Sequence, residues 1–230
     1  MNVTDAELTI VALSLKIAIT ATLFSLPFAI LIAWVLARGA FAGKALLNIA
    51  VHLPLVLPPV VTGYALLLLF GKQGVIGSFL YDSFGITLAF RWSGAALAAA
   101  IMGFPLMVRA IRLGFEAVDR KLEDAAATLG ASKVAVFWHV TLPLIMPAIL
   151  AGTVLGFAKA MGEFGATITF VASIPGQTET LPSAIYTLLQ VPGGENAALR
   201  LILLSIVISI AALAVSEVFA RRAAKRVSGK

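Results

Sequence analysis

Long runs of apolar residues, each free of charge, divide this 230-residue sequence. Hydrophobic residues make up 60% of the chain and charged residues only 12%, and the mean hydropathy is +1.03. A helix needs about 20 consecutive apolar residues to cross the roughly 30 Å hydrocarbon core of a bilayer. The runs lack the polar residue at every second position that marks a membrane β-barrel. The sequence therefore predicts an all-α integral membrane protein.

Five of these runs are candidates for membrane-spanning helices. The longest has 27 uncharged residues between Lys44 and Lys72, and the shortest has 16 between Arg200 and Glu217. We expect one transmembrane domain over residues 1–230 with about five spans. The predicted spans are roughly 11–36, 46–70, 88–108, 140–161 and 199–220.

The distribution of lysine and arginine predicts the orientation of the spans. Cytoplasmic loops of membrane proteins carry an excess of these residues. Of the 17 basic residues, twelve fall on the side that holds the 109–139 loop and the C-terminus. This places the N-terminus outside, the C-terminus in the cytoplasm and the longest cytoplasmic loop at 109–139. The net charge of +6 then reflects basic loops beside membrane lipids, not binding of nucleic acid.

The N-terminal sequence and the lack of cysteine each exclude one kind of feature. The opening MNVTDAELTI has no basic region, so no cleavable signal peptide is expected. The absence of cysteine excludes disulfides and thiol chemistry.

The cytoplasmic loop contains a stretch with helical periodicity and six charged residues within 119–133. Asp119 is a suitable N-cap and Gly130 a suitable residue to end the helix, which predicts a helix over 120–129. A helix this short is marginal alone in water. It either lies on the membrane surface or docks on a cytoplasmic partner. Its apolar face, at helical spacing, comprises Leu122, Ala125, Ala126 and Leu129.

The same loop resembles the EAA loop of permease subunits from binding-protein-dependent ABC importers. The matching positions are Asp124-Ala125-Ala126, Gly130 and Val140-x-Leu142-Pro143. Asp124 stands where that family usually has Glu, although Glu123 next to it could supply the longer carboxylate. Residues 52–70, 90–112 and 162–194 also resemble the molybdate permeases among these proteins. Tungstate and sulfate permeases are close relatives, so a sister oxyanion remains an alternative substrate.

The resemblance implies the importer-permease fold, a location in the cell inner membrane and a set of partners. The loop helix would be a coupling helix seated in a cytoplasmic ABC ATPase dimer, which carries the ATP and Mg. An extracytoplasmic molybdate-binding protein would deliver the anion. Five helices are too few to enclose a path, so we expect a homodimer. The chain itself would be no enzyme and hold no cofactor. The residues expected to couple to the ATPase are Leu122, Glu123, Asp124, Ala125, Ala126, Leu129, Gly130 and Pro143.

Three prolines, Pro54, Pro58 and Pro59, interrupt the second predicted span. Each removes a backbone donor, and freed carbonyls within a membrane must be satisfied by protein or by a water-lined cavity. The prolines are either a packing kink or part of the translocation path, with Thr62 as a hydroxyl donor beside it.

Lys159 and Glu163 lie four residues apart on one predicted helical face. Such a pair either neutralises itself to lower the cost of burial or forms an outer gate for an entering dianion. The candidate path residues are therefore Pro54, Pro58, Pro59, Thr62, Lys159 and Glu163.

Other motifs predict no chemistry in this chain. GAFAGK (39–44) lacks P-loop spacing, and Ala45 follows its lysine where Ser or Thr is required. His52 and His139 are too far apart to suggest a metal site. We see neither the internal repeat of a secondary transporter nor aspartates within the spans for an intramembrane enzyme. In the external segment 173–197, Thr180 is expected to cap a short helix with Pro182 in its first turn.

Overall fold

The computed structural model describes residues 4–228, and within that range the chain is helical and has no β-strand. The predicted all-α class is therefore confirmed. In chain order the helices are α1 (Asp5–Arg38), α2 (Lys44–Val56), α3 (Pro59–Phe70), α4 (Val75–Phe84), α5 (Trp92–Ala117), α6 (Arg120–Thr128), α7 (Lys133–Val136), the π-helix η1 (Phe137–Thr141), α8 (Leu142–Met161), α9 (Gly165–Val171), α10 (Leu181–Leu188) and α11 (Glu195–Ser228).

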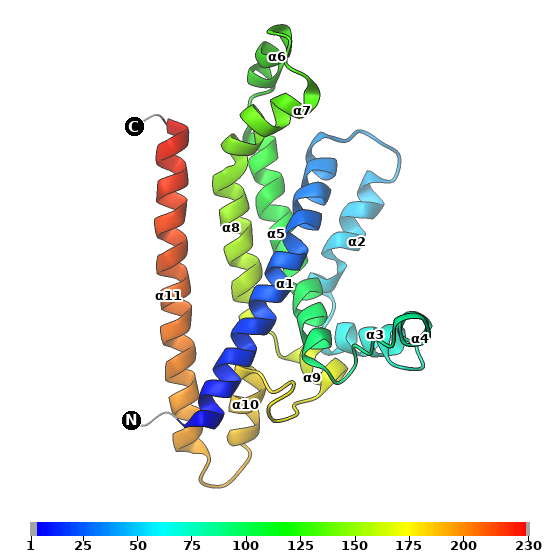
Figure 1. The fold of residues 1–230 in the computed structure, drawn as a ribbon, viewed down its shortest axis with the longest axis vertical. Helices are drawn as coiled ribbons and strands as arrows, with labels where there is room; N and C mark the ends of the chain where they lie inside the picture. Colours follow the sequence, from blue (N-terminus) through cyan, green and yellow to red (C-terminus); the bar gives the residue numbers. More distant parts are fainter. Residues whose placement is uncertain (1–3, 229–230) are drawn as a thin grey trace.

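Four long helical segments form the bundle and run along the long axis of the molecule (Figure 1). Segments within α1, α5, α7–α8 and α11 are long and apolar enough to cross a membrane. The α6 end of the molecule also holds the end of α11, whereas α1 begins at the opposite end (Figure 1). The two described chain ends therefore lie at opposite ends of the bundle. Which end faces the cytoplasm stays a prediction.

The second predicted span, 46–70, is broken at its prolines into two helices. The chain bends by 112° between α2 and α3. Pro58 and Pro59 at the bend have no N–H group to continue the helix, so α2 ends at Val56 and α3 starts at Pro59. In the region of the third predicted span, 88–108, α5 begins at Trp92 and continues to Ala117.

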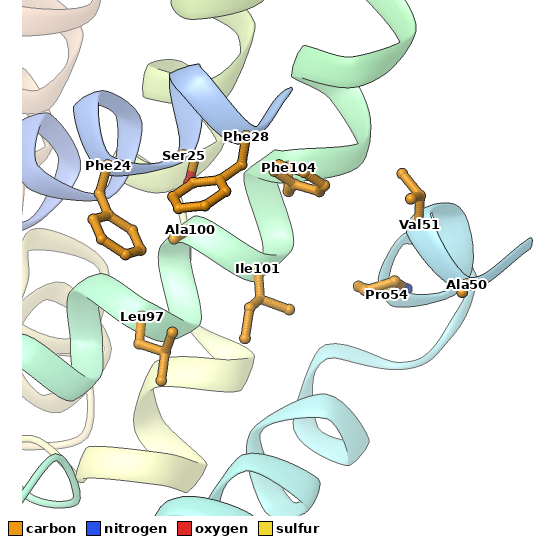
Figure 2. A pocket seen from close by; sticks show the side chains of 10 residues that line it. All are labelled: Phe24, Ser25, Phe28, Ala50, Val51, Pro54, Leu97, Ala100, Ile101 and Phe104. Atoms are coloured by element: carbon orange, nitrogen blue, oxygen red, sulfur yellow. The ribbon is translucent and has the colours of Figure 1, made fainter. Parts of the chain in front are cut away.

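Helix α2 stands away from the bundle over part of its length and leaves an apolar pocket of about 460 Å³. The pocket lies between α1, α2 and α5 (Figure 2). Phe24 and Phe28 of α1, Phe104 of α5 and Pro54 of α2 line it. Its walls are almost entirely apolar, so the pocket offers few groups that could hold an oxyanion.

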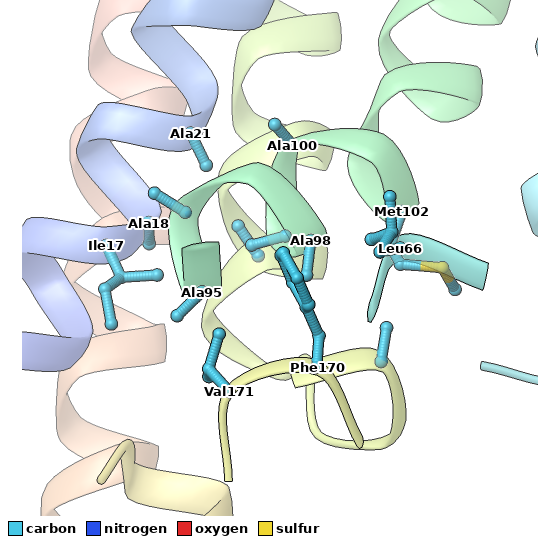
Figure 3. Close-up of a cluster of buried hydrophobic side chains, with 14 of the residues drawn as sticks. Ile17, Ala18, Ala21, Leu66, Ala95, Ala98, Ala100, Met102, Phe170 and Val171 are labelled. Carbon is cyan, nitrogen blue, oxygen red and sulfur yellow. The ribbon is translucent and has the colours of Figure 1, made fainter. Parts of the chain in front are cut away.

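Small residues let α1 and α5 approach closely, as is common between helices in membranes. Ala18 of α1 and Ala95 and Ala98 of α5 are fully buried. They belong to a core cluster to which α9 contributes Phe170 and Val171 (Figure 3). A second cluster lies nearer α6 and is built from larger side chains, including Leu36, Met107, Val108, Ile111, Phe115, Ile145 and Ile149.

The bent pair α2–α3 packs against a second break in the chain, between α8 and α9. A Cβ atom at Gly63 of α3 would lie 2.4 Å from the carbonyl oxygen of Ala166 in α9. One at Gly165 would lie 2.7 Å from Cβ of Pro59. The close approach of the two backbones therefore requires both glycines. As a result, the α2–α3 break packs directly against the α8–α9 break.

Replacing Gly63 by valine should destabilise this crossing, because no space exists for a side chain. We expect a loss of about 1–3 kcal/mol, the usual cost of overpacking. The loss would be measured as a lower midpoint of thermal unfolding in detergent. Ala65→Val, at an exposed position on the same helix, is the matched control and should leave the midpoint unchanged. A Gly63→Val midpoint equal to that of the control would contradict the close packing of α3 on α9.

Candidate functional site

Helix α6 lies at one tip of the molecule, beyond the ends of the long helices (Figure 1). The Asp119 carboxylate caps it by accepting a hydrogen bond of 3.0 Å from the Lys121 N–H. Gly130 follows it with a φ of +88°, a left-handed conformation that glycine adopts without strain. The predicted helix is confirmed, and it ends at Thr128, one residue before the expected end.

One face of α6 exposes apolar side chains to solvent. Leu122 is 50% exposed and Leu129 is 90% exposed, and Ala125 is exposed beside them. Asp124 is also exposed, but at 3.6 residues per turn it points away from this face. Ala126 is half-buried. Apolar side chains gathered on an exposed surface mark an interaction site.

Sequence reasoning missed two residues next to this face. Val134 of α7 and Trp138 of η1 are 67% and 59% exposed, and α6 contacts both of these elements. Both lie in the loop predicted at 109–139, but only the fold shows how far their side chains are exposed.

The other face of α6 turns toward the bundle through Glu123. Its Oε1 atom lies 3.1 Å from Nη2 of Arg38, and it accepts a hydrogen bond of 2.7 Å from the Thr141 hydroxyl. Of the predicted coupling residues, Glu123 is thus engaged within the chain. That it contacts an ATPase stays a prediction.

A π-helical turn, η1, joins α7 to α8. In it the Leu142 N–H bonds to the Phe137 carbonyl, one residue further back than in an α-helix. Pro143, the last of the predicted coupling residues, lies in the first turn of α8 and has no N–H to offer the His139 carbonyl. The missing donor accounts for the wider turn. Such turns occur frequently at functional sites.

The predicted Lys159–Glu163 ion pair is confirmed, although Glu163 lies just past the end of α8 and not on its face. Lys159 Nζ lies 2.6 Å from Glu163 Oε2, and Glu163 is only 2% exposed. The second carboxylate oxygen accepts a hydrogen bond of 2.9 Å from the Ala166 N–H in the first turn of α9. Glu163 therefore neutralises Lys159 and caps α9 at the α8–α9 break. Its role as a gate stays a prediction.

The structure brings some of the candidate path residues together. Pro59, Thr62 and Glu163 all lie at the crossing of α3 and α9. The buried Thr62 hydroxyl has no hydrogen-bond partner among the described residues. Pro58 lies at the bend beside them, whereas Pro54 lies apart, in the wall of the apolar pocket (Figure 2).

The opposite end of the molecule is closed by α10 and the start of α11. Thr180 and Ser183 form a capping box at α10, so the predicted cap and Pro182 in the first turn are confirmed. Leu181 N–H donates to Ser14 Oγ at 2.8 Å, and Arg200 pairs with Glu7 at 2.8 Å. In the preceding loop, burial raises the pKa of the Glu179 carboxyl. The Leu181 contact joins α10 to α1, and the Arg200 pair joins α11 to α1.

Comparison with known proteins gives matches over nearly the whole chain. Residues 11–225 match the family model described as binding-protein-dependent transport system inner membrane component. The molybdenum transport system permease protein ModB of Escherichia coli K12 is 60% identical over 98% of this chain and 99% of its own length. The corresponding protein of Haemophilus influenzae is 52% identical over 96% of each chain.

More distant matches share the architecture. The sulfate transport system permease protein CysT of Salmonella typhimurium is 38% identical over 77% of this chain and 64% of its own length. A bacterial ABC transporter involved in alginate import has a TM-score of 0.74 with 16% identity, covering 96% of this chain and 80% of that one. At that identity the likeness concerns the fold alone.

Lys159→Met should destabilise the chain because it leaves the buried Glu163 carboxylate without its cation. We expect a loss of about 2–3 kcal/mol, below the roughly 3–5 kcal/mol typical of breaking a fully buried pair, since the Lys159 side chain is 28% exposed. Denaturant unfolding in detergent would measure it. The double variant Lys159→Met/Glu163→Gln should regain much of the loss, because a neutral amide still accepts from Ala166. A double variant as unstable as the single one would contradict this account.

Proposed function

Since this chain belongs to the family of inner-membrane components of binding-protein-dependent transport systems, we propose that it is the membrane-spanning permease subunit of an ATP-driven importer for molybdate. It is a multi-pass protein of the inner membrane. The observation that carries the proposal is the exposed face of α6. A water-exposed helix with an apolar face at the tip of a membrane bundle needs a partner, and the loop that holds it resembles the EAA loop in its spacing.

We favour molybdate as the substrate because this chain is similar to a molybdenum permease over nearly the full length of both proteins. The second candidate is a sister oxyanion such as sulfate or tungstate. It is supported by the lower but extended identity to a sulfate permease.

The α6 end is proposed to face the cytoplasm, with the N-terminus outside. Most of the basic residues are at that end by the sequence count. The opposite end, with α10 and the 172–194 loop, would meet a substrate-loaded binding protein. The 1–230 chain is proposed to act as one permease domain.

A complete importer needs further subunits. Two copies of the chain would form the path between them, since five crossings at most cannot enclose one. Each copy would dock one subunit of an ATPase dimer, which would hold ATP and Mg. This chain would carry no ATPase site and do no covalent chemistry.

The cycle would run on differences in affinity between conformational states. ATP binding would draw the two ATPase subunits together and move the two α6 helices with them. The long helices would then shift between inward-open and outward-open arrangements. The α3–α9 crossing, where Glu163 caps α9, lies toward the end opposite α6, where an outer gate would be (Figure 1).

Uptake of labelled molybdate in cells with and without this gene tests the substrate. We expect gene-dependent uptake that persists in excess sulfate. Uptake that a modest excess of sulfate abolishes would move the assignment to sulfate. Uptake indifferent to the gene would contradict the importer function.

Asp124→Lys should weaken assembly with the ATPase, because it reverses an exposed charge on the helix proposed to dock there. We expect at least a tenfold higher Kd, about 1.4 kcal/mol, in titrations of purified permease with ATPase. Asp82→Lys on α4 makes the same change at an exposed site away from the α6 tip. It is the matched control and should not alter the Kd. Equal affinities for both variants would contradict the proposed contact.

A further inference from the structure

We propose that Glu123 is a positioning residue that ties the coupling helix α6 to α1 and α8, so that a movement of α6 is passed directly to two membrane-spanning helices. The inference rests on the proposed importer function. It adds to that function the side chains through which this chain would transmit the movement.

A single carboxylate oxygen makes the tie. Glu123 Oε1 accepts from Arg38 Nη2 at 3.1 Å and from Thr141 Oγ1 at 2.7 Å. Arg38 is the last residue of α1, and Thr141 is the last residue of η1, directly before α8. These partners lie 85 and 18 residues from Glu123 in the sequence. The contact therefore joins three elements that the chain order keeps apart.

The tie is more sheltered than an ordinary surface pair. The side chains of Arg38 and Glu123 are 15% and 23% exposed, and Thr141 is 4% exposed. By comparison, the Arg112–Glu116 pair within α5 is 30% and 40% exposed. Solvent and salt screen partly buried ion pairs less than exposed ones. Exposed ion pairs contribute little to stability.

Helix α6 has few other means of attachment. None of its nine residues is buried, and a helix of that length is marginal by itself. Val118 and Asp119 connect it to α5, and the segment 129–132 connects it to α7. Without the Glu123 contacts, α6 could shift against the bundle while its covalent connections absorbed the movement.

The position of Thr141 means that Glu123 is bonded to the α8 side of the π-turn and not to the α7 side. Thr141 lies on the α8 side of the π-turn, whose altered hydrogen bonds make it the natural point of bending between α7 and α8. By accepting a hydrogen bond from Thr141, Glu123 contacts the residue directly before α8, beyond the π-turn. The next residue, Asp124, is exposed and, one position further along the helix, points about 100° away from Glu123.

The test is the number of ATP molecules hydrolysed per molybdate imported by the complete complex in proteoliposomes. Glu123→Gln keeps an acceptor for Thr141 and loses the charge that holds Arg38. We expect this ratio to rise at least about fivefold, the lower end of couplings between distant sites. Arg38→Gln should raise the ratio similarly, and the exchange Arg38→Glu/Glu123→Arg should lower it again.

Glu116→Gln is the matched control, because it removes the same charge from the exposed pair in α5. Its ratio should equal that of the native complex. A native ratio in Glu123→Gln, with native uptake intact, would overturn the inference and leave the importer function standing. Absence of molybdate uptake by the native complex would overturn both.

A second measurement applies if Glu123→Gln assembles poorly. Spin labels at the exposed positions Ala40, after α1, and Ala127, on α6, report the distance between these elements in the isolated permease. We expect a broader distance distribution in Glu123→Gln than in the native chain. A distribution as narrow as the native one would overturn the inference.

Discussion

The whole fold depends on the requirement that backbone N–H and C=O groups within a bilayer be paired inside the protein. Long helices meet it along most of this chain. It is hardest to meet where the helices break, at Leu57–Pro58 and at Gly162–Phe164. The structure places the two breaks against each other, with Pro59 on Gly165 and Gly63 on Ala166. Glu163 then satisfies a backbone donor at the start of α9.

Close packing of small residues makes the rest of the bundle stiff. Fully buried alanines bring α1 and α5 together, and Gly152 and Gly156 of α8 lie against Ile111 and Met107 of α5. Helices packed in this way move as units because the interface has little free volume. Bending is then concentrated at the breaks and at the π-turn before α8, where hydrogen bonding is already altered. Those are the places where an alternating-access transporter of this fold would change shape.

The sequence predicted the features that depend on local chemistry. Asp119 and Gly130 delimit a short helix by capping alone, and the Lys159–Glu163 pair follows from helical spacing. The prolines signalled an interruption in the second span but not its 112° angle. That angle depends on the packing of α3 on α9, which no local pattern encodes. For the same reason, the contact of Arg38 with Glu123 was not foreseen: the residues are 85 positions apart, and only the fold brings them together.

The two faces of α6 would allow so short a helix to serve as the proposed joint. A helix held only by an external partner would follow that partner and leave the bundle behind. A helix buried in the bundle would offer the partner no surface. α6 avoids both limits because Leu122, Asp124 and Leu129 are exposed while Glu123 alone is bonded inward. Since the inward tie ends on α1 and on the start of α8, movement applied at the tip would enter the stiff part of the bundle at two points, and not through a flexible loop.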